Sequence, residues 1–290
     1  MKIFFKILSI LLITMLIYSC EKDSRLVTPD YTPRLVIHSY ISPSDTILRV
    51  HVSTNKNIYG EVNEYPKALP VEVTLTDGDK AIKFSPSDTF GFCTVKYNVF
   101  PGHQYKLTAR CKGYPDISAV CNIPDLNNNM NIVIDTSTEI SSYNAQRLKV
   151  LLKFEDLPNE KNFYSSAAIL IYSYRDNPYY GEFYGFLYPL NKKNEEIRES
   201  VVYSDYLMDG QEFVHSFRGN VENNPTLIPS KVIVNVLEID NDYYLHETSL
   251  KTYKGTEDSL TEFSPLYTNV TGGYGIFASY IKYEKIFKWK

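Results

Sequence analysis

The sequence predicts a mainly β protein built from two antiparallel sandwich-like bodies, the second of which carries one short helix. Three observations predict this fold class. Apolar residues recur at every second position in many short segments, which is the period of a half-buried strand. Clusters of Gly, Pro, Asn and Asp separate these segments, and turns favour these residues. A single segment of helical length has apolar residues spaced for one helix face.

The first 19 residues are typical of a secretory signal peptide. Lys2 and Lys6 flank the start of an almost unbroken apolar run that ends at the small polar Ser19. A transmembrane anchor is the rival interpretation, but a spanning helix needs about 20 apolar residues and this run is shorter. The run Leu16-Ile17-Tyr18-Ser19-Cys20 resembles a bacterial lipobox, in which cleavage after Ser19 makes Cys20 the first mature residue and the carrier of acyl chains. An ordinary signal peptide with an incidental cysteine is the alternative.

Acylation of Cys20 would hold the chain on a membrane without a spanning helix, because each buried methylene contributes about 0.8 kcal/mol. We therefore predict a signal peptide over residues 1–19 and a lipidated tether over residues 20–33. Glu21-Lys22-Asp23 resembles the acidic export signal with which Bacteroidota lipoproteins reach the outer face of the outer membrane. The predicted localisation is the outer membrane, lipid-anchored and exposed at the cell surface.

Residues 34–124 are predicted to form the first sandwich. Alternating apolar residues mark strands near 35–38, 48–53, 71–75, 81–84, 105–111 and 117–123. Asp77-Gly78 predicts a hairpin, with both residues at the central turn positions where φ is positive.

Three cysteines follow Cys20, namely Cys93, Cys111 and Cys121, and they lack CxxC spacing. A metal or redox pair is therefore not expected. Cys111 and Cys121 would face inward on neighbouring strands, but counting from the turn places Cys121 opposite Thr108, so a bridge would need a register shift. We predict buried thiols, and a disulfide is the alternative.

Residues 125–290 are predicted to form the second body, because Pro124 and the polar run after it mark a boundary. Strands are expected over 147–154, 163–174 and 231–237. The helix begins at Asp240-Asn241-Asp242, where any of the three side chains could cap free N–H groups.

Composition and motifs indicate little chemistry. The formal net charge is −4, and removal of a leader with two lysines makes it more negative, so a nucleic-acid partner is not expected. The five histidines form no HxH or HExxH pair. Asp240-Asn241-Asp242 lacks the glycine and distal glutamate of an EF-hand calcium loop. Calcium is likewise not expected at the second acidic loop of Asp205, Asp209 and Glu212. No GxSxG, phosphate-loop or dinucleotide motif occurs. We therefore predict no catalytic residue, no metal site and no cofactor.

Two stretches are unusual. Aromatic residues crowd 172–188, and the candidate binding patch there is Tyr179, Tyr180, Phe183 and Tyr184. The favoured interpretation is that these aromatic residues fill the core, since strands favour them. The second stretch contains Gly272, Gly273 and Gly275, which would let a loop take positive φ or approach another backbone closely.

Several motifs occur in a fixed order along nearly the whole mature chain. They are the lipobox, Leu35-Val36-Ile37, Gly102-x-x-Tyr105-x-Leu107, Ile123-Pro124, Asp156 with Asn162-Phe163-Tyr164, Ser204-Asp205 with Asp209-Gly210, Asp242-Tyr243-Tyr244, and Asn269-Val270-x-Gly272-Gly273-x-Gly275-Ile276-Phe277. The set resembles the DUF4249 family, a domain of unknown function found in Bacteroidota outer-membrane lipoproteins. The resemblance implies that the first domain is Ig/transthyretin-like (carboxypeptidase-regulatory-like). It supplies no catalytic residues, and it implies frequent genetic neighbours that are TonB-dependent receptors.

The expected function is that of a non-enzymatic accessory lipoprotein, which binds a TonB-dependent receptor or a ligand such as a small molecule, peptide or glycan. An adhesin or surface-structure subunit is the alternative, because it would also be a tethered sandwich. A hydrolase acting on glycans or peptides is a third candidate, for which the chain has carboxylates enough.

Overall fold

The computed structural model describes residues 32–56, 68–127, 130–140, 145–175, 182–191, 193, 201–222, 224–256 and 265–289. Residues Pro33–Lys290 make one compact unit, within which two hydrophobic cores can be distinguished. The described part of the chain is mainly β with a single helix, so the predicted fold class is confirmed. Ser19, Cys20, Tyr179 and Tyr180 lie outside the described residues. Of the helices described, none is long and apolar enough to cross a membrane.

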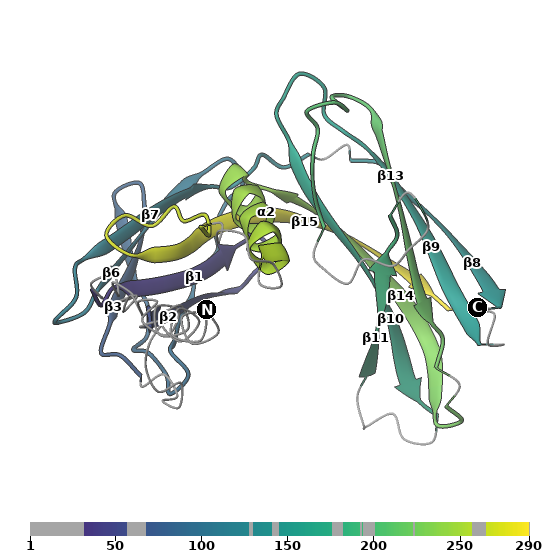
Figure 1. Cartoon of the computed structure of the whole chain (residues 1–290), viewed down its shortest axis with the longest axis horizontal. Coiled ribbons are helices and arrows are strands. Elements are labelled where there is room, and N and C mark those ends of the chain that lie inside the picture. Colours follow the sequence, from purple (N-terminus) through teal and green to yellow (C-terminus); the bar gives the residue numbers. More distant parts are fainter. Residues whose placement is uncertain are drawn as a thin grey trace, which may run out of the picture. The chain divides into compact units, whose positions relative to one another are not determined.

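The first core lies between two sheets (Figure 1). One sheet has the order β4-β3-β6-β7, and the other contributes β5-β2-β1 and the first part of β15. The strands are β1 (Leu35–Ile41), β2 (Ile47–Thr54), β3 (Glu72–Asp77), β4 (Lys80–Lys83), β5 (Phe92–Lys96), β6 (Gln104–Arg110), β7 (Ile117–Asn122) and β15 (Tyr274–Lys288). Alternate residues of the strands face the core, as the buried Leu35, Ile37 and Ile41 of β1 do.

The β3–β4 hairpin exists, but its turn is shifted by one residue from the prediction. Asp77 pairs with Lys80, so Gly78 and Asp79 occupy the central positions. Gly78 has a φ of 57°, whereas Asp79 is not among the residues with positive φ. Positive φ at the first central position alone is the pattern of a type II′ turn, which suits the twist of a hairpin equally well.

Cys93, Cys111 and Cys121 are free and buried, so the prediction of buried thiols is confirmed. The predicted register was wrong, because Cys121 pairs with Tyr105 and Thr108 pairs with Ser118. Counting from the turn failed because the segment between β6 and β7 is longer than a tight hairpin loop. Burial raises the pKa of Cys93 to about 11, so this thiol stays protonated at neutral pH.

The second core is enclosed by one sheet that curls on itself, in the order β15-β14-β10-β11-β13-β9-β8. Rings from opposite sides meet across it, as Phe154 of β9 and Tyr164 of β10 do at 5.1 Å between centroids. Its further strands are β8 (Ile132–Ile140), β9 (Gln146–Glu155), β10 (Phe163–Tyr174), β11 (Glu182–Pro189), β12 (Val202–Ser204), β13 (Glu212–Asn220) and β14 (Leu227–Ile239).

Strand β15 joins the two cores, and Figure 1 shows it in yellow. Its first residues pair in parallel with β1, from Val36 opposite Tyr274 onward. Its remaining residues pair antiparallel with β14, from Ile239 opposite Tyr280 to Lys231 opposite Lys288. The predicted domain boundaries did not include this contribution of the C-terminal strand to the sandwich formed by residues 34–124.

The helix α2 (Asn241–Thr256) begins where the sequence predicted. The N–H of Tyr243 donates to Asp240 Oδ1 at 2.7 Å, so Asp240 is the N-cap. The other carboxylate oxygen of Asp240 accepts the N–H and the hydroxyl of Ser279, each at 2.8 Å. One side chain therefore fixes the helix start against β15.

The glycine-rich segment takes positive φ and approaches other backbones closely, as predicted. Gly272 and Gly275 have φ values of 83° and 106°. A Cβ on Gly275 would overlap the carbonyl oxygen of Ile37, and a Cβ on Gly273 would overlap that of Leu35. These positions must lack a side chain for β15 to lie beside β1.

Asn269 completes this junction. Its side chain accepts the N–H of Phe277 at 3.0 Å and donates to the carbonyl of Phe277 at 2.7 Å, as a neighbouring strand would. It also donates to Asp242 Oδ2 at 2.9 Å. We call the contacts made by Asp240, Asn269, Gly273, Gly275 and Ser279 the seam.

Candidate functional site

A cleft of about 670 Å³ opens beside the seam. This volume is typical of pockets that bind small ligands or the tip of a partner. Residues from both halves of the chain line it: Gly102, Asn122, Ile123, Pro124, Asp125, Leu157, Glu160, Lys161, Asn162, Phe163, Glu238, Ile239, Asp240, Asn241 and Asp242. A smaller cavity of about 480 Å³ lies by β8 and the end of β15, and Lys288 is the one charged residue of its lining. The larger cleft is therefore the stronger candidate, which we call the acidic cleft.

The charge of the acidic cleft is strongly one-sided. Five of its lining residues carry carboxylates, namely Asp125, Glu160, Glu238, Asp240 and Asp242. The single lining cation is Lys161, whose Nζ lies 5.0 Å from the centre of the Phe163 ring. Carboxylates that converge on a concave surface concentrate negative potential there. The cleft is thus suited to a positively charged group.

Glu238 is the most deeply buried of these carboxylates, with 4% of its surface exposed. Burial, followed by repulsion from Glu160, Asp156 and Asp125, raises its pKa to about 7. The Tyr283 hydroxyl donates to Glu238 Oε2 at 3.1 Å and partly opposes this shift. At neutral pH a cation in the cleft would therefore compete with a proton on Glu238.

Asp240 has a smaller shift of the same sign. Burial raises its pKa to about 6, although the hydrogen bonds from Tyr243 and Ser279 favour the charged form. Asp242 adds further repulsion. The cleft therefore keeps two carboxyl groups in surroundings that disfavour their charge.

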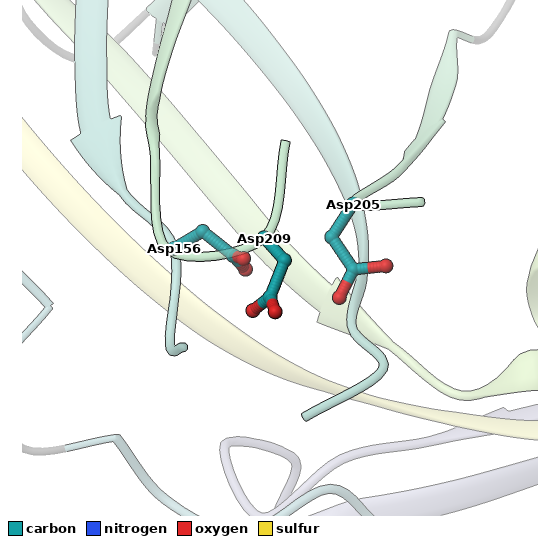
Figure 2. A group of neighbouring side chains, drawn as sticks. All are labelled: Asp156, Asp205 and Asp209. Carbon is teal, nitrogen blue, oxygen red and sulfur yellow. The ribbon is translucent and has the colours of Figure 1, made fainter. Parts of the chain in front are cut away.

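Asp156, Asp205 and Asp209 form a second acidic group, which is connected to the cleft through Asn162 of the cleft lining. One carboxylate oxygen from each lies within 4.8 Å of the others. Figure 2 shows the three carboxyl groups beside one another; Asp205 and Asp209 come from the loop between β12 and β13, and Asp156 follows β9. The sequence indicated an acidic loop that contains Asp205 and Asp209, but no local pattern placed Asp156 with them.

Each of these three carboxylates accepts hydrogen bonds from other residues of the chain. Asp156 accepts the Tyr164 hydroxyl at 2.7 Å and the Gly210 N–H at 2.9 Å. Asp205 accepts the N–H of Asn162 at 2.7 Å, and Asp209 accepts that of Asn159 at 2.8 Å. Hard cations prefer such oxygen ligands, so these three residues could hold one. Without a cation, these hydrogen bonds fix two loops to each other.

The loop fixed in this way presents an apolar tip. Tyr206 and Leu207 are 85% and 81% exposed, the highest values among the large apolar side chains described. They directly follow Asp205, whose N–H donates to the carbonyl of Asn162 in the cleft lining. An exposed tyrosine and an exposed leucine on a loop that hydrogen bonds hold in place are typical of a contact surface.

The predicted aromatic patch is partly described. Phe183 and Tyr184 are exposed on β11, so the favoured interpretation as core is wrong for them. Alternation accounts for Tyr184, which pairs with Ile171 on the outer face of β10. It does not account for Phe183, which pairs with the buried Tyr172 and lies 5.8 Å from its ring, between centroids. The structure does not place Phe183 and Tyr184 among the residues of the acidic cleft.

One serine–histidine pair invites a catalytic interpretation. Ser166 Oγ lies 2.8 Å from His215 Nδ1. Both residues are buried, and the Tyr203 ring stacks on the His215 ring at 3.8 Å between centroids. Burial lowers the pKa of His215 to about 4, which weakens it as a base at neutral pH. The pair is absent from the linings of both cavities described above, so it serves the second core.

Three histidines that are distant in sequence meet in space. His38 pairs with His51 across β1 and β2, and the His246 ring lies 6.1 Å from the His38 ring. No motif indicates this group, because its members come from three separate elements rather than from one element with regular spacing. His246 Nδ1 lies 3.0 Å from the carbonyl oxygen of Tyr267, which ties the helix to the seam segment. The three histidine rings therefore pack near one another as part of the fold.

Sequence reasoning missed the acidic cleft as a unit. Its carboxylates come from three separated segments, and the pairing of β14 with β10 brings two of these segments together. A local sequence pattern could have identified part of the acidic cleft. Glu238, Asp240 and Asp242 alternate directly after an apolar strand, which predicts acidic side chains at the end of a sheet.

The fold and this site define a class of protein: a two-core β protein with an acidic cleft beside the strand that joins the cores. The chain belongs to the family described as domain of unknown function DUF4249, whose model matches residues 21–286. The resemblance predicted from the motifs is thus confirmed at the level of the family. No curated protein matches the chain.

Proposed function

We propose that this chain is a non-enzymatic, lipid-anchored protein of the outer-membrane surface that binds a positively charged group of a ligand or partner in its acidic cleft. The observation that carries the proposal is the one-sided charge of a 670 Å³ cleft with Glu238 buried in its wall. The partner class that the family resemblance implies is a TonB-dependent receptor.

The cost of keeping this cleft acidic supports a binding role. Groups that the fold holds in unfavourable protonation states concentrate at functional sites. Glu238 and Asp240 both have raised pKa values, and a bound cation would favour their charged forms. The Tyr206–Leu207 tip supplies apolar area next to the charged region, which is the composition of a protein contact.

The membrane part of the proposal rests on Cys20 and is tested separately. Cys20→Ala should abolish labelling with a radioactive fatty acid and release the chain from the outer-membrane fraction. Unchanged fractionation of this variant would contradict lipid anchoring while leaving the cleft untouched.

The binding part is tested by capture from outer membranes. The lipidated wild-type chain, carrying an affinity tag, should recover a β-barrel receptor from detergent-solubilised outer membranes. Asp125→Lys/Glu160→Lys reverses two exposed charges of the cleft and should reduce recovery at least tenfold. The control Asp135→Lys/Glu139→Lys makes the same charge change on β8 and should recover as much receptor as the wild type.

Equal loss in both double variants would show a general charge effect and contradict the cleft as the site. Recovery of no receptor and no bound ligand by the wild type would contradict the function itself.

An adhesin or surface subunit is the second candidate, and one observation favours it. Strand β8 is an edge of the large sheet with exposed Val133 and Ile140, and such an edge can accept a strand from another chain.

A further inference from the structure

The sheet around the second core has two edges that do not meet. Along the path β15-β14-β10-β11-β13-β9-β8, every neighbouring pair of strands is antiparallel (Figure 1). The path has seven strands, so its two end strands, β15 and β8, run in the same direction. In the described part of the chain, β8 pairs only with β9, and β15 from Tyr280 onward pairs only with β14. Each end strand therefore has one edge whose backbone groups bond to no other described strand.

The smaller cavity, of about 480 Å³, lies between these two edges. Residues 136–138 of β8 line one side of it, and residues 287–289 at the end of β15 line the other. Leu148 and Val232, which belong to the second core, complete its lining. The cavity therefore connects the gap between the two edges with the apolar core. None of its lining residues lines the acidic cleft, so the gap is a separate site.

Side chains on the inner face of both edges are in solvent. Thr138 of β8 pairs with the buried Leu148 and shares its face, yet Thr138 is exposed. Ile140, two residues further along the same face, is 66% exposed. On β15, Lys285 pairs with the buried Val234 and is also exposed. These inward-facing positions are uncovered because no strand lies between β8 and β15.

We infer that the gap between β8 and β15 binds one extended strand of a partner protein, which runs antiparallel to both edges. Because β8 and β15 have the same direction, a single strand of opposite direction pairs antiparallel with both at once. Its addition gives eight strands, and a barrel of eight strands is just wide enough for side chains to fill its interior. The odd number of strands thus determines both how many strands bind and in which direction.

The side chains around the gap indicate the sequence of the bound strand. Its inward-facing residues would contact Leu148, Val232 and Phe287, so every second position should be apolar. Lys288 is the one charged residue of the cavity lining, and it forms no ion pair in the described part of the chain. A carboxylate of the bound strand would complement this charge. The partner segment is therefore extended, apolar at alternate positions and acidic where it passes Lys288.

The first test uses the lipidated chain in detergent and a fluorescent synthetic peptide as long as β8, Thr-Val-Glu-Val-Thr-Val-Glu-Val-Thr. This peptide should bind at least tenfold more tightly than the same peptide methylated on every second amide nitrogen, which cannot donate hydrogen bonds to one of the two edges. Lys288→Glu should weaken binding of the unmethylated peptide at least threefold. Lys106→Glu, the same charge change on exposed β6, is the control and should leave binding unchanged.

The second test gives the chain an eighth strand of its own. The same nine residues, joined to the C-terminus through Asn-Gly, would turn back and run antiparallel to β15. This extension should lower the affinity for the free peptide at least tenfold and slow hydrogen exchange of the β8 amides. An extension with proline at every second position, which lacks the N–H groups, is the control and should do neither.

Three results would overturn the proposal. The first is that the unmethylated peptide does not bind, or binds no better than the methylated one. The second is that the extension neither competes with the peptide nor protects β8. The third is that the wild-type chain forms dimers which the extension dissociates, because a second copy rather than another protein would then fill the gap.

Discussion

The seam and the acidic cleft share Asp240 and lie side by side, yet their residues are in opposite situations. At the seam the side chains of Asp240, Asn269 and Ser279 are all hydrogen-bonded, and Gly275 leaves no room for a side chain beside Ile37. In the cleft, Glu238 and Asp240 are carboxyl groups whose pKa values are raised by burial and by neighbouring carboxylates.

The comparison distinguishes residues that stabilise the fold, at the seam, from carboxylates in the cleft that lower its stability. Changes at the seam should lower the free energy of unfolding, whereas neutralising Glu238, the buried carboxylate that belongs to the cleft alone, should raise it. Proteins commonly give up stability at sites that bind or react, so the sign of a mutational effect indicates which role a residue has. The following variants test that sign, in order of decreasing size.

Gly275→Val should have the largest effect. A Cβ at this position would overlap the carbonyl oxygen of Ile37, and its φ of 106° disfavours any side chain. We expect a loss of about 4 kcal/mol or more, enough to prevent folding of a chain of ordinary stability. The measurement is the soluble, protease-resistant fraction after expression. Gly113→Val, at a positive φ with open space around it, is the control and should cost far less.

Glu238→Gln should stabilise the chain, and only at higher pH. In the unfolded chain Glu238 loses its proton near 4.5, whereas in the folded chain it does so near 7. The folded state therefore binds more protons between these values, so its stability falls as pH rises through this window. A shift of this size corresponds to about 3 kcal/mol at pH 8 and to almost nothing below pH 4.5.

Urea unfolding of Glu238→Gln at pH 4.5 and pH 8 measures this difference. Glu160→Gln, an exposed residue of the same cleft, should change neither value by more than about 0.5 kcal/mol. If Glu238→Gln were less stable than the wild type at pH 8, Glu238 would stabilise the fold as the seam residues do. The contrast between the two regions would then be wrong.

Ser279→Ala should cost about 2 kcal/mol at every pH near neutrality. Its hydroxyl is fully buried and lies 2.8 Å from both Asp240 Oδ2 and the carbonyl oxygen of Asn122. Removing it takes away the one hydroxyl donor that these two acceptors, from the two halves of the chain, share. Thermal unfolding measures the effect, and Thr252→Ala on the exposed side of α2 serves as the matched hydroxyl control.

Tyr206→Ala/Leu207→Ala should barely change stability, by less than about 0.5 kcal/mol for each residue, because both side chains are in solvent. Capture of the partner should nevertheless fall several-fold if the tip adjoins the bound surface. Unchanged capture, measured with the same tagged chain, would confine binding to the charged cleft.

Local patterns were sufficient for the strands, the helix start and the role of the glycines. Period-two alternation located β1, β2 and β9. The helix start follows from Asp240-Asn241-Asp242 before an apolar helical face, but the sequence did not single out Asp240 among the three as the cap. The close backbone approach at Gly275 was predictable because glycines concentrate where the chain takes positive φ or where no side chain fits. These features depend on neighbours in sequence.

Contacts between distant segments were not predictable in this way. The acidic cleft and the Asp156 group depend on loops that meet only in the folded chain, and the exposure of Tyr184 depends on which face of the sheet the second core occupies. The partner of Cys121, Tyr105 rather than Thr108, shows a different limit, since counting from the turn did not allow for the length of the segment between β6 and β7.

Strand β15 also sets the order in which the molecule can be completed. Synthesis proceeds from the N-terminus, so β1 is available long before the strand that becomes its parallel neighbour. During that interval β1 has an open edge, on which another unfinished chain could pair. Pairing between the two ends of a chain is slow, which lengthens the interval. A chain that lost its last strand would therefore leave an edge in each core unpaired, and its main hazard would be aggregation rather than a locally weakened fold.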